Sequence, residues 1–560
     1  MRLRRLEGAL AGSSKRRIWI FFLIALVVVG PAGAAKRHRA KARKSVPLAV
    51  TIQQILADPA VARAHWGISV VTPEGKPVFA LNDAQLFEPA SNAKLFTTAA
   101  LLSVVPANTT WTTTVGSLAQ PDAQGVLKGN LLLTGVGDPT LSGRQYPWDG
   151  KTERPSPPLQ ALESLADQIV ASGVKTVDGD VVGDDSWFAY ERYGGDWAWD
   201  DLQWDYGAPV SALTVNDNVQ YLNVTFPAGA AAPAVVAWNP DVPYYTLENS
   251  LTLAAPGEAA HSGIDRAPGS KTVRLYGAVT ANGMHEALAI EDPAEFAATA
   301  LRQMLLARGV TVTGTAKAYH RMSVDTEDYG DEVHKPVVLQ PLTVATITAQ
   351  QAGSDGAGAG TAWHTLASHV SPPVAEDVTV TLKVSQNLHA EIYLRLLGRL
   401  EANDGSIAQG ARVVRQFLTN AGVDPGDFVF YDGSGLSPAD LITPRAATTL
   451  LTYAAKQPWG ALYRSALPVG GVDGTLSNRF TGEMKGRVFA KTGTLGEVNA
   501  LSGYLTAKSG KTLVFSVLCN DHDPTSEAAK MALDRIVTAV ADSNQGVGGR
   551  VDVQPVAGGW

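Results

Sequence analysis

Strand patterns near both ends of the chain most constrain how it can fold. Apolar and polar residues alternate over 66–80 around a Pro-Glu-Gly-Lys turn, and a second hairpin is predicted over 501–520 around Lys-Ser-Gly. A helix is predicted after it, over 525–541. Another helix is predicted between the two hairpins, just after residue 91. Strands early and late in the chain, with that helix between them, predict an α/β (α+β) domain that is closed by both ends of the chain. The long middle of the chain would then be an insertion into that domain.

Three short polar motifs point to a catalytic site. In chain order they are S-x-x-K at Ser91–Lys94, S-x-N at Ser385–Asn387 and K-T-G at Lys491–Gly493. Residues three apart share one face of a helix, so a lysine at 94 can take the proton of a serine at 91. The second motif adds a hydroxyl and an amide, and the third adds a cation and a hydroxyl beside a glycine that permits close approach. Together they supply a nucleophile, a base, a proton shuttle and an anchor for a carboxylate.

The settings of the motifs argue against coincidence. A second S-x-x-K match at Ser172–Lys175 contains Gly173 where a helix is predicted to end, so its two side chains would not share a helical face and we discard it. Apolar residues on nearly all sides of 95–102 predict a buried helix after Ser91, and the run 487–490 predicts a strand that leads into Lys491.

The chain of 560 residues is 45% hydrophobic, enough for more than one core. Its start resembles an export signal: six basic side chains within 1–17 precede an apolar run over 18–30, which is followed by Ala-Gly-Ala at 32–34. The alternative is an uncleaved membrane anchor over residues 18–35. A basic leader is assigned to 35–50.

Charge is divided unevenly along the chain. Residues 1–34 carry net +5 and residues 35–45 net +6, so with −7 overall the body from residue 46 carries −18. Such an acidic body excludes nucleic acid as a partner. The basic run 36–44 could contact anionic lipid or a wall polymer, or it could be a solvated leader.

Other reactive residue types give weaker signals. Cys519 is the only cysteine, so no intrachain disulfide can form, and its apolar strand predicts a buried thiol. His522 has acidic neighbours but no second ligand cluster, so neither a metal nor another cofactor is predicted. His389 is interpreted as a structural helix residue. Asp432 and Ser434 lie in a Gly-rich turn that either shapes a cleft wall or simply makes the turn.

The insertion contains an internal echo. A helix over 159–171 ends at Gly173 before a strand, and a helix that begins at Asp292-Pro293 ends at Gly309 before another. These units bracket a segment of short alternating strands. The predicted organisation is a catalytic domain over 51–108 and 365–545, an inserted accessory domain over 109–200 and 286–364, and a nested β-rich subdomain over 201–285.

The chain resembles the low-molecular-mass penicillin-binding proteins of the D-alanyl-D-alanine carboxypeptidase/endopeptidase family, in which a large insertion follows the nucleophile helix. Beyond the three motifs, the resemblance covers about residues 50–540 and is carried by 135–141, 183–188, 206–209, 371–373, 432–437 and 471–476. Gln386 departs from the pattern, since the family usually has aspartate there. Its side chain need not face the substrate, so we expect a change of tuning and not a loss of activity.

The resemblance implies a penicillin-binding, transpeptidase-like sheet-and-helix domain with inserted β-rich accessory subdomains, exported to the periplasm or cell envelope. It implies a serine-type D-Ala-D-Ala carboxypeptidase, or a DD-endopeptidase, that acts on peptidoglycan stem peptides and is inhibited covalently by β-lactams. The motifs do not distinguish these two activities. Alternatives are a penicillin-binding sensor or wall-binding protein with negligible turnover, and a serine β-lactamase, which the long insertion disfavours.

Roles follow from the chemistry of the groups. Ser91 is the nucleophile, and Lys94 is its base, with a pKa that burial and the neighbouring Lys491 must lower. Ser385 relays the proton, and Asn387 holds Lys94 and the substrate amide. Lys491 must stay charged to bind the substrate carboxylate. The remaining substrate contacts are assigned to Thr492, Gly493 and Thr494.

Overall fold

The computed structural model describes residues 47–151, 154, 156–226, 234–323, 330, 334–342 and 363–543, which belong to one compact unit beginning at Val46. The predicted export signal and nearly all of the basic leader lie outside the described residues. Among the residues that are described, no helix is both long enough and apolar enough to span a membrane.

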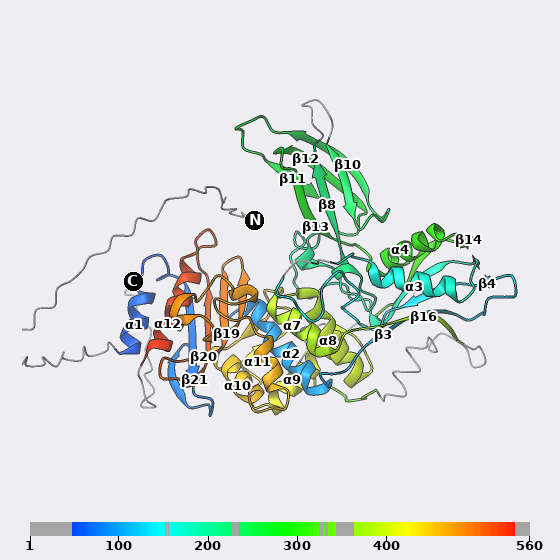
Figure 1. Ribbon diagram of the computed structural model, residues 1–560. Helices are drawn as coiled ribbons and strands as arrows, with labels where there is room; N and C mark the ends of the chain where they lie inside the picture. Colours follow the sequence, from blue (N-terminus) through cyan, green and yellow to red (C-terminus); the bar gives the residue numbers. More distant parts are fainter. Residues whose placement is uncertain are drawn as a thin grey trace, which may run out of the picture. The chain divides into compact units, whose positions relative to one another are not determined.

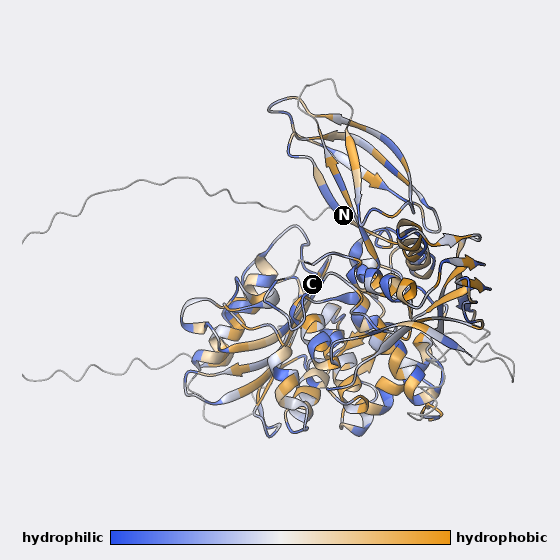
Figure 2. Ribbon diagram, turned by 45° about the vertical axis from the view of Figure 1, so that its right-hand side comes forward, coloured by the Kyte–Doolittle hydropathy of each residue, from blue (hydrophilic) through white to orange (hydrophobic). Residues whose placement is uncertain are grey.

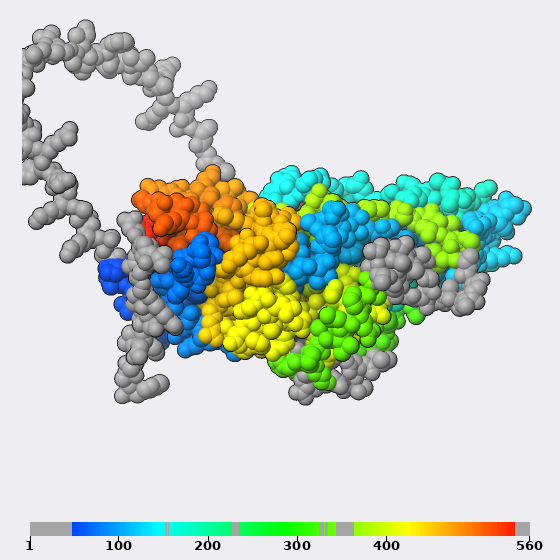
Figure 3. Space-filling model, turned by 90° about the horizontal axis from the view of Figure 1, so that it is seen from below, coloured from blue at the N-terminus to red at the C-terminus, as the bar shows by residue number. Residues whose placement is uncertain are grey.

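A five-stranded antiparallel sheet joins the two ends of the described chain. Its order is β19 (Val488–Leu495), β20 (Val498–Thr506), β21 (Thr512–Asn520), β1 (His65–Val71) and β2 (Pro77–Leu81). The early strand β1 pairs along its whole length with the late strand β21, from His65 opposite Asn520 to Val71 opposite Val514. Blue and orange-red atoms accordingly lie side by side in Figure 3. Both predicted hairpins are confirmed.

Helices cover both faces of this sheet (Figure 1). On one face α1 (Leu48–Leu56) packs against α12 (Ala528–Asp542), and the core between them and the strands includes Ile52, Phe515 and Ile536. A second core lies among the helices of the other layer, which are α2 (Ala93–Val104), α7 (Val374–Lys383), α8 (Asn387–Ala402), α9 (Ile407–Asn420), α10 (Pro444–Ala454) and α11 (Gly460–Ala466). All ten residues from Ala93 to Leu102 are buried, so the predicted central helix is confirmed.

The insertion has a core and sheets of its own. Its larger sheet has the order β15 (Ala316–Arg321), β7 (Val181–Ala189), β5 (Leu131–Thr134), β3 (Thr112–Ser117) and β16 (His364–Val370). The predicted echo is confirmed: α3 (Gln160–Ala171) leads to β6 (Thr176–Asp178), α4 (Pro293–Ala307) leads to β14 (Thr311–Val312), and the two short strands pair in parallel. Strand β4 (Val126–Lys128) completes this small sheet.

The nested segment forms two three-stranded sheets around a small apolar core. The strands are β8 (Val219–Thr225), β9 (Val235–Asn239), β10 (Thr246–Leu253), β11 (Ser262–Asp265), β12 (Thr272–Val279) and β13 (Met284–Ala289). Hydrophobic and hydrophilic residues alternate along several of them, as expected for sheets with one buried face (Figure 2).

The domain boundaries stay predictions, and the strand pairing suggests two adjustments. Because β16 pairs with β3, we propose that the insertion extends to Val370. Because the strands of the nested segment run from Val219 to Ala289, we propose these residues as its limits.

Candidate active site

Ser91 lies in a single 3-10 turn, η1 (Ala90–Asn92), that leads directly into α2. The turn brings Lys94 Nζ to 2.8 Å from Ser91 Oγ, as the spacing of the first motif predicted. Lys94 is completely buried. The nucleophile and its candidate base are therefore in contact within one helical turn.

Two further acceptors fix the hydrogen bonds of Lys94. Its Nζ lies 2.6 Å from Asn387 Oδ1 and 2.7 Å from the Ser434 carbonyl oxygen. The orientation of the Asn387 amide is set independently, because its Nδ2 donates to the Tyr206 carbonyl oxygen at 2.8 Å. A neutral amine has two hydrogens and one lone pair, so donation to these two oxygens leaves the lone pair for the hydroxyl of Ser91. The geometry suits a base.

The electrostatic environment agrees with that role. Burial lowers the pKa of Lys94 from its ordinary value to about 7, although the carboxylates of Asp432, Glu391 and Asp440 act in the opposite direction. Burial, rather than the charge of Lys491, is the main cause. At neutral pH a substantial fraction of Lys94 is consequently unprotonated.

The second and third motifs meet through Lys491. Its Nζ donates to Ser385 Oγ at 2.8 Å and to the Thr492 carbonyl oxygen at 2.8 Å. Ser385 precedes α8 with φ of 64°, a left-handed conformation that is strained for a residue with a side chain. Such strain persists only where the surroundings hold the residue in place, as they do at functional sites.

The pKa of Lys491 requires a correction. We expected a lysine that stays charged, but burial lowers its pKa well below the ordinary value, and nearby Lys94 lowers it further. The physical reason is that Lys491 is fully buried, which disfavours its charged form, and that the charge of Lys94 acts in the same direction. The site by itself therefore shifts the protonation equilibrium of Lys491 toward the neutral form.

The K-T-G motif lies on β19, the edge strand next to the Ser91 turn. The Asn92 side chain donates to the Lys491 carbonyl oxygen at 3.3 Å. A Cβ at Gly493 would lie 2.6 Å from the Pro89 carbonyl oxygen, so only glycine permits this approach. The hydroxyls of Thr492 and Thr475 lie 2.8 Å apart, and Thr494 Oγ1 lies 3.4 Å from Asn499 Oδ1.

The Gly-rich turn at 432–437 has a role that the sequence left open. Asp432 accepts hydrogen bonds from the backbone N–H groups of Ser434, Gly435 and Ser437 at 2.9, 2.6 and 2.7 Å. This arrangement fixes the turn so that the Ser434 carbonyl faces Lys94. Ser434 and Tyr206 both contribute through their backbone carbonyl oxygens, so no side-chain pattern predicted these two contacts.

The remaining sequence expectations can be placed as well. Cys519 is buried and His389 lies buried on α8. His522 lies just after β21 and contacts Asn499 Nδ2 at 2.5 Å, and within the described ranges no three His, Cys, Asp or Glu side chains are arranged so that they could hold a metal ion. Ser172 caps the end of α3, before Gly173 with φ of 93°, so the discarded motif does not form a helical pair.

A cavity of about 700 Å³ lies elsewhere, in the insertion. Gln120, Lys175 and Trp363 are among its lining residues, and no residue of the three retained motifs contributes to it. Hydrogen-bond geometry, and not cavity size, therefore locates the candidate active site.

Known proteins are similar to this chain in sequence and in fold. Residues 48–327 and 337–540 match the D-Ala-D-Ala carboxypeptidase 3 (S13) family. The D-alanyl-D-alanine carboxypeptidase of Actinomadura sp. (strain R39) is 32% identical over 90% of this chain and 87% of its own length. D-alanyl-D-alanine carboxypeptidase DacB of Haemophilus influenzae is 24% identical over 71% of this chain and 73% of its own. The crystal structure of penicillin-binding protein 4 (dacB) from Haemophilus influenzae superposes with a TM-score of 0.70 at 20% identity, covering 89% of this chain and 98% of the other.

Proposed function

Because the chain belongs to the D-Ala-D-Ala carboxypeptidase 3 (S13) family and is a serine peptidase, we propose that it hydrolyses peptidoglycan stem peptides through an acyl-enzyme on Ser91. The observation that carries this proposal is the contact between Ser91 Oγ and a buried Lys94 whose other two hydrogen bonds are already assigned. A lysine in that setting can accept the serine proton at neutral pH.

The proposed reaction has two halves. Lys94 Nζ takes the proton of Ser91 Oγ as that oxygen attacks the carbonyl carbon of the penultimate D-alanine. The peptide C–N bond breaks, and the proton that Lys94 took passes by way of Ser385 to the leaving amine of the terminal D-alanine. Water then gives a proton to Lys94 as it attacks the ester, and Lys94 returns that proton to Ser91 Oγ as the shortened peptide leaves. Backbone N–H groups of Ser91 and Thr494 would stabilise the oxyanion, each by roughly 3–4 kcal/mol.

Substrate recognition is assigned to the third motif. Lys491, Thr492, Gly493 and Thr494 would bind the free carboxylate of the terminal D-alanine along β19. A carboxylate placed beside Lys491 would favour the ammonium form, so binding would raise its lowered pKa. The charge needed for recognition is then formed on binding.

The test of the proposed function is a pair of assays on the wild type and on Ser91→Ala. We expect labelled penicillin to acylate the wild type at Ser91, mapped by peptide digestion, and D-alanine to be released from a pentapeptide. Acylation without D-alanine release would favour the sensor, and rapid loss of the β-lactam would favour a β-lactamase. Label on Ser91→Ala would refute the nucleophile assignment.

Mass spectrometry of purified muropeptides tests the finer activity. Loss of one D-alanine from pentapeptides indicates carboxypeptidase action, whereas conversion of cross-linked dimers to monomers indicates endopeptidase action.

We further propose that the enzyme works in the cell envelope, since its substrate polymer lies outside the cytoplasm. Residues 1–34 supply the pattern of an export signal, and residues 36–44 supply cations for peripheral contact with anionic lipid or wall polymer. Edman sequencing of the exported protein would show whether its N-terminus begins after the small residues at 32–34 or whether an anchor over 18–35 is retained.

A further inference from the structure

A buried carboxylate of the insertion lies against the start of the helix that carries the second motif. Asp217 is the central residue of the turn η3 (Asn216–Asn218), and only 1% of its surface is exposed. All three residues of this turn have left-handed backbones, with φ of 49°, 53° and 53°. An unpaired charge at such depth would be strongly unfavourable, so the carboxylate of Asp217 needs partners that compensate its charge.

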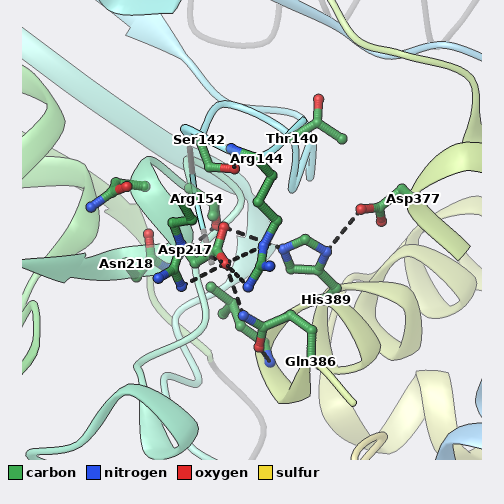
Figure 4. A network of polar contacts seen from close by, with 12 residues as sticks. Thr140, Ser142, Arg144, Arg154, Asp217, Asn218, Asp377, Gln386 and His389 are labelled. Carbon is green, nitrogen blue, oxygen red and sulfur yellow. Dashed lines mark hydrogen bonds and ion pairs between the residues drawn. The ribbon is translucent and has the colours of Figure 1, made fainter. Parts of the chain in front are cut away.

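Two arginines of the same insertion compensate the charge. Arg144 Nη2 and Arg154 Nη2 lie 2.6 and 2.7 Å from Asp217 Oδ2, and both side chains are themselves at least nine-tenths buried. Burial alone would raise the pKa of Asp217, but the two guanidinium groups, aided by His389, hold it well below its usual range. Asp217 is thus a fixed anion, presented by a rigid turn (Figure 4).

Gln386 connects this anion to the second motif. Its Nε2 donates to Asp217 Oδ2 at 2.9 Å, and its Oε1 accepts from the backbone N–H of Leu388 at 3.0 Å, capping α8. The amide nitrogen donates to a carboxylate and the amide oxygen accepts from a backbone N–H, so the two ends cannot exchange places and the orientation of the side chain is fixed. Gln386 stands between Ser385 and Asn387, so fixing it also restrains the two residues that contact Lys491 and Lys94.

His389 adds a second connection one turn further along α8. Its Nε2 lies 3.5 Å from Asp217 Oδ1, and its Nδ1 lies 2.8 Å from Asp377 Oδ1 on α7. Burial would lower the pKa of His389, but the two carboxylates raise it to about 9. The hydroxyls of Tyr146 and Tyr393 also donate to Asp377. A charged imidazolium between two carboxylates holds α8 to both α7 and the insertion.

We propose that Asp217 is a positioning residue, which acts through Gln386 and His389 to keep Ser385 and Asn387 in their reactive geometry. The strained φ of 64° at Ser385 needs such external support, since a left-handed conformation is unfavourable for a residue with a side chain. Asp217 touches no reacting group. The inference rests on the acyl-enzyme function proposed above, and it explains why a donor, rather than a second carboxylate, occupies position 386.

Two substitutions isolate the connection. Asp217→Asn keeps the shape but removes the anion, and Gln386→Asn keeps an amide that can cap a helix but shortens it by one methylene, so that it cannot also reach Asp217. The matched control is Glu291→Gln. Glu291 is likewise a buried carboxylate between two arginines, Arg192 and Arg266, but all three lie in the insertion and contact none of the motif residues.

The measurements are the pre-acylation Kd for penicillin, the acylation rate constant, and Tm by circular dichroism. We expect each single substitution to lower the acylation rate constant about 10-fold or more while Kd changes little, because small displacements of catalytic groups act on the chemical step. The double variant should be no slower than Asp217→Asn, since that substitution already disrupts the Asp217–Gln386 connection that Gln386→Asn removes. Glu291→Gln should have a lower Tm than the wild type, but its acylation rate constant should stay within about twofold of the wild-type value.

Three results would overturn the proposal: losses that add in the double variant, an equal loss in Glu291→Gln, or unchanged acylation in either folded single variant. If Asp217→Asn does not fold, Gln386→Asn decides alone. Failure of the wild type itself to be acylated would instead refute the proposed function, so the two failures are distinguishable.

Discussion

At the scale of single residues, Lys94 and Lys491 have the same side chain and similar burial, yet the proposed mechanism asks different things of them. Lys94 must lose a proton to act as a base, and its fixed partners are two oxygens that accept and one hydroxyl that can donate. Lys491 must become a cation when a carboxylate binds. Three predictions test this division.

Arginine at each position should have unequal effects. Lys94→Arg keeps a cation that does not deprotonate in proteins, so acylation by penicillin should fall by at least about 1,000-fold, in the upper range for loss of a general base. Lys491→Arg keeps a cation near the carboxylate and should retain a measurable fraction of wild-type acylation, with part of the loss in Kd. Stopped-flow acylation kinetics on both variants measure this. Substantial activity in Lys94→Arg would remove Lys94 as the base.

The acylation rate constant of the wild type should rise with pH through a midpoint near 7. Below that midpoint Lys94 is protonated and cannot accept the Ser91 proton, and above it the neutral form predominates, with burial as the cause of the low pKa. The measurement is acylation by a β-lactam from pH 5 to 9, with a parallel check that Tm stays high. A flat profile over this range would contradict a titrating Lys94.

Binding of a carboxylate ligand should be accompanied by proton uptake. Burial and nearby Lys94 lower the pKa of Lys491 well below its ordinary value, and a carboxylate bound beside it would raise that pKa, so we expect binding to shift Lys491 toward the protonated form. Titration calorimetry of Ser91→Ala with a D-Ala-D-Ala peptide at pH 8, in buffers of different ionisation enthalpy, counts the protons. In Ser91→Ala/Lys491→Arg the uptake should vanish, since guanidinium is already charged. Equal uptake in both proteins would assign the proton to another group.

At the scale of elements, the close approach of two loops builds the pocket for Lys94. Gly435 has φ of 78°, and a Cβ there would lie 1.9 Å from the carbonyl oxygen of Ala90, in the Ser91 turn. Gly435→Ala should therefore push the Ser434 carbonyl away from Lys94. It should also destabilise the fold by more than about 1 kcal/mol, because the steric clash adds to the backbone strain of a positive φ. We expect acylation to fall at least about 10-fold.

The control for that substitution is Gly510→Ala in the turn between β20 and β21. Gly510 has nearly the same φ, 80°, but nothing lies within 4 Å of the added methyl group. It should lose stability from backbone strain alone and keep wild-type acylation. Similar acylation losses in the two variants, measured beside urea unfolding, would show that strain rather than close approach is responsible.

At the scale of the whole molecule, the insertion divides into a part that supports the site and a part that does not contact it. Tyr206 and Asp217 contact the second motif, but both precede the strands of the nested segment. The first and last of these strands pair with each other, Leu222 opposite Glu286. A short linker can therefore join the chain on either side.

Replacing 222–286 with a Gly/Ser linker should leave penicillin acylation within about threefold of the wild type, since the removed residues are remote from the site. Tm should fall, because Arg266 pairs with Glu291 and Tyr244 packs in the core of the insertion. Activity on intact peptidoglycan should change while activity on a soluble pentapeptide persists. A folded protein that no longer acylates would show that the nested segment contributes to the active site.

Local patterns in the sequence determined the hairpins, the buried helix after Ser91 and the paired helix and strand units, and three short motifs identified the candidate catalytic groups. Each of these depends on the order of apolar, polar and special residues within about twenty positions. The sequence did not predict the neutral tendency of Lys491, the Ser434 and Tyr206 carbonyls, or Asp217. A backbone carbonyl has no sequence signature, and a pKa depends on burial, which segments far apart along the chain create together. The sequence by itself therefore determined which chemistry this protein can perform, and only the tertiary structure decided which groups hold that chemistry in place, because those groups meet across separations of 169 residues or more, as Gln386 meets Asp217.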